Sequence, residues 1–222
     1  MKYEQKFMGG SIEPWGPTGW HWPVEDTGLW EGPRNEWQHK LRPWIDDHVK
    51  RKHNVVQAGG GCGMYPRLLS GMFSNVFTFE PDPQNFHFLN LNCEGTNVKR
   101  FNCALGHRHG NVNFYPPGPS NRGVGRTGRD GDLDADPVVG DTPLLMVDDF
   151  VFQEMSLLFL DVENFEYYAL KGSINTIIKH RPVIICESAD TNVKNFLENL
   201  GYVVGEHQGA DTLFKVENGS VS

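Results

Sequence analysis

The feature that most constrains this chain is the alternation of short apolar runs with helical patterns from residue 54 onward. The runs 157–160 and 182–186 are apolar throughout, which is typical of strands buried on both faces of a sheet. Patterns with helical spacing follow the strands, as at 164–179 and 193–200. Such alternation implies right-handed crossovers. The sequence therefore predicts an α/β fold, with helices on both faces of a mostly parallel central sheet.

The individual elements follow from the same reasoning. Strands are expected at 55–58, 75–80, 98–103, 157–160 and 182–186, and a C-terminal antiparallel strand pair at 202–204 and 212–216. Helices are expected at 37–49, 64–73, 83–93, 164–179 and 193–200. Pro43 is expected in the first turn of its helix, where a missing N–H costs least. Because ligands of such sheets bind at the carboxyl ends of strands, the strand-end residues are the candidates for function: Gly59, Glu80, Asp161 and Glu187.

Residues 1–40 differ in composition from residues 41–222, which carry the strand–helix pattern. This arm combines prolines and glycines with five indole rings, at Trp15, Trp20, Trp22, Trp30 and Trp37. Proline and glycine at this density forbid a long helix. We expect an irregular arm whose rings pack onto the main domain. A substrate lid, or a contact between subunits of a homo-oligomer, is the alternative, since Trp is favoured at binding surfaces.

The segment at about 116–143 lacks any periodic pattern. It is too long for an ordinary connection, so we expect a mobile or substrate-covering loop. Its alternating carboxylates, at 130, 132, 134 and 136, do not fit an EF-hand calcium loop, because Ala135 and Asp141 stand where Gly and Glu are required. Arginines in the same segment would suit an anionic acceptor in the alternative of a covering loop: Arg122, Arg126 and Arg129.

Composition narrows the class of partner. The net charge of −8 would repel a polyanion on average, so a nucleic-acid substrate is disfavoured. No apolar run approaches the length of a membrane span, and the polar N-terminus does not resemble a signal peptide. The four cysteines form no CxxC pair and are interpreted as reduced thiols. We therefore expect a cytoplasmic protein without a membrane segment.

The first motif with chemical meaning is the glycine-rich turn 59–63, which follows the strand 55–58. Glycine permits positive φ and close approach of a ligand to the backbone, and the next helix offers free N–H groups. Glu80, at the end of the next strand, is placed to accept hydrogen bonds from ribose hydroxyls. The dinucleotide pattern G-x-G-x-x-G is broken at Met64 or Pro66, so a single nucleoside is favoured over NAD.

The second motif is the segment 161–166, which follows a wholly apolar strand. A carboxylate at Asp161 or Glu163 could take a proton from a hydroxyl, orient it or hold a metal. The alternative is that Glu163 and Glu166 only complement the N-terminus of the next helix. Asp161 is the first candidate for a catalytic base, and Glu187 a weaker one. Histidines are scattered: His107 and His109 are expected in solvent, and His21 is a base only if the arm covers the site.

Together these motifs resemble the FkbM-like methyltransferases over residues 54–204. The resemblance lies in the glycine-rich turn and in segments 79–86, 102–106, 147–150, 161–166, 170–172 and 181–182. It implies a Rossmann-like class I methyltransferase fold that binds S-adenosylmethionine and usually methylates a hydroxyl oxygen. By position it implies that the cofactor contacts one set of residues: Gln57, Gly59, Gly61, Gly63, Glu80, Pro81, Asn102, Cys103, Ala104 and Asp161. Glu80 would hold the ribose, and 102–104 would lie beside the adenine.

This chain departs from the family pattern at three positions. It has Gln57 where the family usually has Asp, Asn164 where it usually has Gly, and Gly61 or Cys62 where it usually has Asn. Asn tolerates the left-handed conformation better than most residues, so the turn at Asn164 should form. We predict an O-methyltransferase for a small molecule or sugar, without a metal. The alternatives are an S-adenosylmethionine-binding protein without transferase activity and a Rossmann-like enzyme that binds a nucleotide or NAD.

Overall fold

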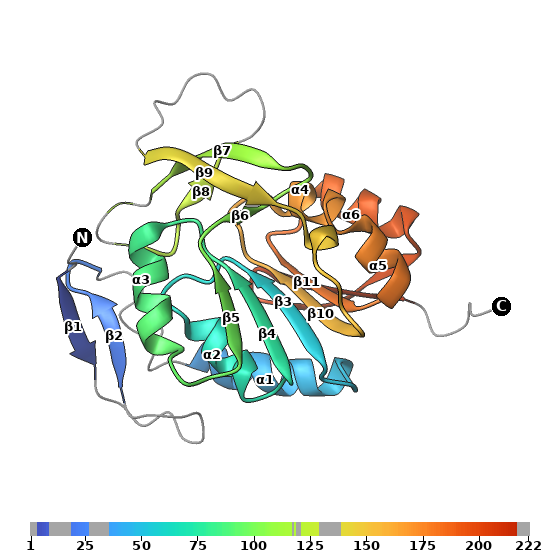
Figure 1. Ribbon diagram of the computed structural model, residues 1–222. Coiled ribbons are helices and arrows are strands. Elements are labelled where there is room, and N and C mark those ends of the chain that lie inside the picture. Colours follow the sequence, from blue (N-terminus) through green and yellow to red (C-terminus); the bar gives the residue numbers. More distant parts are fainter. Residues whose placement is uncertain are drawn as a thin grey trace.

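The computed structural model describes residues 4–8, 19–26, 36–116, 118, 121–128 and 139–216 (Figure 1). The carboxylate run at 130–136, Arg129, Trp15 and Trp30 lie outside the described residues. The side chain of Trp37 is likewise not described. Expectations placed on these residues remain predictions.

The main sheet has seven strands, five of them mutually parallel in the order β5-β4-β3-β10-β11. β13 pairs antiparallel with β11 and with β12 at the far edge, so the expected C-terminal antiparallel pair is confirmed. The strand bounds are β3 Asn54–Ala58, β4 Asn75–Phe79, β5 Val98–Phe101, β10 Met155–Leu160, β11 Val183–Glu187, β12 Tyr202–Gln208 and β13 Asp211–Val216.

Six helices cover the two faces of this sheet, as predicted. Alternate strand residues point to opposite faces, so Val55 joins one apolar core and Val56 the other. α1 (Glu36–His48), α2 (Met64–Ser70) and α3 (Pro83–Asn92) pack on the Val55 face, and α4 (Glu166–Lys171), α5 (Ile174–His180) and α6 (Thr191–Asn199) pack on the other. Figure 1 shows α4, α5 and α6 grouped apart from α1 and α2. No described helix is both long enough and apolar enough to traverse a lipid bilayer.

Two helix predictions were wrong in detail. The helix expected at 164–179 is divided into α4 and α5. The break falls at Gly172, where a Cβ atom would lie 1.8 Å from the carbonyl oxygen of Gly106, so only glycine allows this contact. Pro43 lies in the interior of α1 and not in its first turn, because the helix begins at Glu36. The missing N–H of Pro43 removes one hydrogen bond of that helix.

A second, four-stranded sheet was not predicted. Its order is β6-β9-β7-β8, and it follows directly from the end of β5. The segment expected as a loop at about 116–143 contributes β8 and the first residues of β9. These strands are short or polar, as in the Gly-Asn-Val-Asn start of β7, so no apolar run marks them. The bounds are β6 Ala104–Leu105, β7 Gly110–Tyr115, β8 Arg126–Thr127 and β9 Val139–Leu145, and a 3-10 helix, η2, follows at Val147–Asp149.

The described part of the arm is an antiparallel strand pair, not an irregular segment. β1 (Gln5–Met8) pairs with β2 (Trp20–Pro23), which lies beside α3 (Figure 1). Trp20 and Trp22 are buried in a cluster with Cys62 and Phe88. The Trp22 indole donates to Asp26 at 3.1 Å, which satisfies its N–H group in the interior. Because Cys62 is a residue of the glycine-rich turn, the arm contacts that turn.

Candidate functional site

The glycine-rich turn links β3 to α2 through backbone that only glycine adopts easily. Gly59, Gly61 and Gly63 all have positive φ, at 84°, 51° and 99°. The N–H groups of Gly59 and Gly60 each donate to the carbonyl of Phe79 at 3.0 Å, which fixes the turn against the end of β4. A Cβ atom on Gly61 would meet nothing within 4 Å. The turn therefore presents bare backbone to open space at its centre, as a closely bound ligand requires.

The Gln57 side chain holds the backbone at the start of this turn. Its side chain is fully buried, and its amide nitrogen donates to the carbonyls of Ala58 at 3.0 Å and Gly59 at 2.9 Å. Its amide oxygen accepts from the Thr78 hydroxyl at 2.5 Å. Both ends of the amide are thus engaged within the protein. The neutral side chain at this position thus holds the backbone of the turn, and the cofactor contact that the resemblance implied for Gln57 stays a prediction.

Glu80 ends β4 beside the open centre of the turn. Its carboxylate accepts from the N–H of Gly61 at 2.7 Å and from the N–H of Asp82 at 2.8 Å. Burial raises the pKa of Glu80 to about 7, although the two backbone hydrogen bonds act to lower the pKa. The carboxylate is therefore both buried and adjacent to Gly61, the position where the turn is open.

The segment after β5 closes this side of the site. The Asn102 side-chain amide donates to the carbonyls of Glu80 at 2.8 Å and Pro81 at 3.2 Å. This ties the ends of β4 and β5 together. Asn102 is exposed, while Cys103 and Ala104 are buried. The residues expected to contact the cofactor therefore surround the ends of four adjacent strands, β5, β4, β3 and β10.

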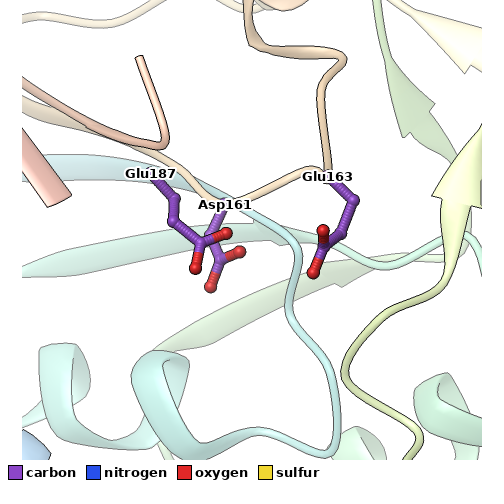
Figure 2. A group of neighbouring side chains, drawn as sticks. All are labelled: Asp161, Glu163 and Glu187. Atoms are coloured by element: carbon purple, nitrogen blue, oxygen red, sulfur yellow. The ribbon is translucent and has the colours of Figure 1, made fainter. Parts of the chain in front are cut away.

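Three carboxylates meet on the other side of the turn, at Asp161, Glu163 and Glu187 (Figure 2). Because Leu160 pairs with Cys186, the next residues along β10 and β11, Asp161 and Glu187, stand side by side. Glu163 reaches the same space from the loop after β10. One carboxylate oxygen from each residue lies within 4.8 Å of the other two. The three residues predicted as catalytic are therefore brought together.

The carboxylates resist ionisation in this setting. Burial raises the pKa of Asp161 well above its ordinary value, and the neighbouring Glu187 raises it further. The pKa of Glu163 is raised by burial and by Glu187 as well. Such a site favours proton uptake or a cation. The three carboxylates are the described residues that could hold a divalent metal ion. That the protein works without a metal stays a prediction.

The backbone around the carboxylates is unusual. Of the four described non-glycine residues with positive φ, three flank the site: Glu163 at 51°, Asn164 at 72° and Ser188 at 46°. The expectation that Asn164 would adopt the left-handed conformation is confirmed. Glu166 is buried and accepts from the N–H of Val162 at 3.1 Å, so its carboxylate braces this turn at the start of α4.

Sequence reasoning missed two neighbours of this group. Asp211 pairs with Glu187 across β11 and β13, so it extends the row of carboxylates. Burial, together with the nearby Glu187 carboxylate, raises the pKa of Asp211 to about 7. Tyr65, on α2, packs edge-on against Phe159 at 5.1 Å between ring centroids, and burial and Asp161 raise its pKa. Asp211 could have been found, because an antiparallel strand begins at the edge where its parallel neighbours end.

The remaining candidates differ in their position relative to the turn. Arg122 forms a buried ion pair with Asp82, the N-cap residue of α3, and its charge acts to lower the pKa of nearby Glu80, while its contact with an anionic acceptor stays a prediction. Arg126 lies over the Tyr115 ring at 5.4 Å. His109, largely exposed, bonds Asp149 at 2.7 Å. The backbone of His21 is bound to Asn92 on α3.

The strand order and the placement of the site define a class I methyltransferase fold. A solved FkbM methyltransferase from Methylobacillus flagellatus is similar, with a TM-score of 0.54 and 18% identity. The similarity covers 74% of this chain, which spans only 43% of that protein. An rRNA methylase from Streptococcus thermophilus gives a TM-score of 0.46 and 12% identity, covering 81% of this chain and 96% of the other. No curated protein sequence matches the chain significantly.

The sequence profile of the Methyltransferase FkbM domain matches residues 64–204. This match takes in more than half of the chain, from α2 to β12. The chain therefore belongs to the FkbM methyltransferase family, as the sequence motifs indicated. The matched region begins at residue 64, directly after the glycine-rich turn at 59–63. The proposal that this turn binds a ligand therefore rests on the geometry of the turn and not on the family match.

Proposed function

We propose that this protein transfers the methyl group of S-adenosylmethionine to a hydroxyl oxygen of a small molecule or sugar. The observation that carries the proposal is the juxtaposition of the open glycine-rich turn with the half-buried Asp161 carboxylate, which follows the strand next to β3. A nucleoside site and a proton acceptor thus lie at the same edge of the sheet. Membership of the FkbM family supports the same reaction.

The residues around the turn fit this cofactor. Gly61 leaves space for a ligand against the backbone, and the adjacent Glu80 carboxylate is suited to ribose hydroxyls. Asn102, Cys103 and Ala104 would lie beside the adenine. When bound, the cofactor supplies an electrophilic methyl group on a cationic sulfur.

The contribution of the chain to the chemistry is proton acceptance and positioning. A neutral alcohol must lose its proton to become a good nucleophile, and Asp161 accepts that proton on its carboxylate. Its raised pKa makes Asp161 a stronger base than an exposed carboxylate. Glu187 keeps this pKa high, and Glu163 lines the same space. The remaining catalysis is orientation of the acceptor and exclusion of water.

The row of carboxylates also bears on the acceptor. Asp161, Glu187 and Asp211 stand on three adjacent strands at the same edge. The row offers carboxyl groups and no cationic side chain of its own, so it suits a neutral or cationic acceptor better than the phosphates of a nucleic acid. This supports the preference for a small molecule or sugar. The alternative is a protein that binds the cofactor without transferring methyl groups.

The variant Asp161→Asn separates these possibilities. It is nearly isosteric and loses the proton-accepting oxygen, so S-adenosylhomocysteine should bind within about threefold of wild type while turnover falls about a hundredfold or more. The assay measures transfer of labelled methyl groups to a panel of alcohols and sugars. The exposed Asp47→Asn is the control. Equal turnover in Asp161→Asn would refute the assignment, and binding without product from any acceptor in the wild type would favour the alternative.

A further inference from the structure

Asn92, the last residue of α3, occupies an unusual position between the N-terminal arm and the glycine-rich turn. Its side chain is buried, with 5% exposure. The amide oxygen accepts from the N–H of His21 at 2.8 Å, and the amide nitrogen donates to the carbonyl of His21 at 2.8 Å. The side chain therefore pairs with β2 as a neighbouring strand would.

The same amide nitrogen also donates to the carbonyl of Cys62 at 2.7 Å. Cys62 lies in the turn, directly after Gly61, whose N–H binds the Glu80 carboxylate. One buried side chain thus connects a strand of the arm to the backbone that faces the proposed cofactor. Removing the amide would break all three hydrogen bonds, two of them to β2 and one to the turn.

The surrounding contacts hold β2 in the same place. Arg67, on α2, donates to the carbonyl of Gly19 at 3.0 Å, and its guanidinium lies 4.4 Å from the centre of the Trp20 ring. Gln84, at the start of α3, donates to Glu25 at 2.7 Å. Trp20 and Trp22 cover the Cys62 side chain. The arm therefore contacts both helices that follow the strands β3 and β4, as well as the turn.

We infer that Asn92 is a positioning residue that couples docking of the arm to binding of the cofactor. When β2 is docked, Asn92 holds the Cys62 carbonyl and with it the open conformation at Gly61. A cofactor that binds this conformation must in turn stabilise the docked arm, because coupling between two sites is reciprocal. This inference rests on the proposed function, since it takes the turn as the S-adenosylmethionine site.

Hydrogen–deuterium exchange of the wild-type chain with and without S-adenosylhomocysteine tests the coupling without any activity assay. We expect slower exchange at 59–63, the proposed cofactor site, and also at 19–26, which lies outside the residues proposed to contact the cofactor. Protection at 59–63 without any change at 19–26 would overturn the coupling and leave the proposed function intact. No protection at either segment would overturn both.

The variant Asn92→Ala tests the role of the residue. We expect the dissociation constant for S-adenosylhomocysteine to rise at least tenfold and the ligand-dependent protection at 19–26 to disappear. Asn90→Ala is the matched control, because among the described residues the Asn90 side chain bonds only the carbonyl of Phe86 in the same helix, at 2.8 Å. Asn92→Asp, which keeps the shape and loses the donors, should behave like Asn92→Ala. Variants that keep wild-type affinity and protection would contradict the assignment.

Discussion

Gly59 lies so close to Asp161 that a Cβ atom on residue 59 would fall 1.7 Å from the carbonyl oxygen of Asp161. The same two strand ends are joined by a hydrogen bond from the N–H of Asp161 to the carbonyl of Ala58, at 3.1 Å. The glycine-rich turn after β3 and the carboxylate group that begins with Asp161 after β10 are thus held together by backbone contact. Any side chain at residue 59 would push them apart.

We therefore predict different outcomes for two glycine substitutions in one turn. Gly59→Ala adds a steric clash to the strain of positive φ and should lower the free energy of unfolding by about 2–5 kcal/mol. Gly61→Ala meets no neighbour and should cost only about 1–2 kcal/mol from its φ of 51°.

The two variants should differ in affinity as well. Because Gly61 faces the open centre of the turn, Gly61→Ala should weaken S-adenosylhomocysteine binding more than tenfold in isothermal titration. Gly95→Ala is the control, with a similar φ of 73°, no neighbour within 4 Å and a position outside the site. Unchanged affinity in Gly61→Ala would show that the cofactor does not bind against this turn.

The pH dependence of turnover follows from the pKa of Asp161. A base acts when deprotonated, so kcat should rise with pH and level off above an apparent pKa well above that of an ordinary carboxylate. Glu187→Gln removes the neighbouring charge that raises this pKa, so the rise should move to lower pH. A profile unaffected by Glu187→Gln would mean that Asp161 is not the titrating group.

Stability should depend on pH through Asp211. Its pKa is raised from 3.8 to about 7 in the folded protein, so its stabilising contribution as a neutral acid is complete below about pH 4. That contribution is lost as the pH rises through 7. Asp211→Asn should therefore raise Tm at pH 8 by at least about 2–4 °C, corresponding to roughly 1 kcal/mol, and change it little at pH 4. Thermal unfolding at both pH values decides this, and a variant less stable at pH 8 would contradict it.

Turnover is predicted to be independent of metal. The carboxylates of Asp161, Glu163 and Glu187 lie close enough together to hold a divalent cation, so an experiment can contradict this prediction. Excess EDTA should leave the rate unchanged, and added Mg²⁺ should not raise Tm. Loss of activity in EDTA, restored by Mg²⁺, would reassign these carboxylates as metal ligands.

The centre of the main sheet could be predicted because β10 and β11 are largely buried and leave uninterrupted apolar runs. The same pattern placed Asp161 and Glu187 at one edge, and parallel pairing brings them together. Asp211 escaped notice because it begins its strand, and only the antiparallel direction of β13 places it at that edge. The second sheet could not be predicted because a strand such as β7 is too polar to form an apolar run.

The role of Gln57 could not be read from the sequence for another reason. The substitution of a neutral amide for a carboxylate suggested a weaker contact with the cofactor. In the structure its two ends bind the turn backbone and the Thr78 hydroxyl, a geometry that depends on the neighbouring strand. The link from β2 through Asn92 is likewise tertiary, since His21 and Asn92 are distant in sequence.

The most direct test of cofactor binding at the glycine-rich turn is a calorimetric titration of the wild-type protein with S-adenosylhomocysteine, with NAD as the comparison ligand. We predict binding of one S-adenosylhomocysteine per chain and no heat from NAD. A chain that binds NAD, or that gives no heat with S-adenosylhomocysteine, would contradict the assignment of the glycine-rich turn.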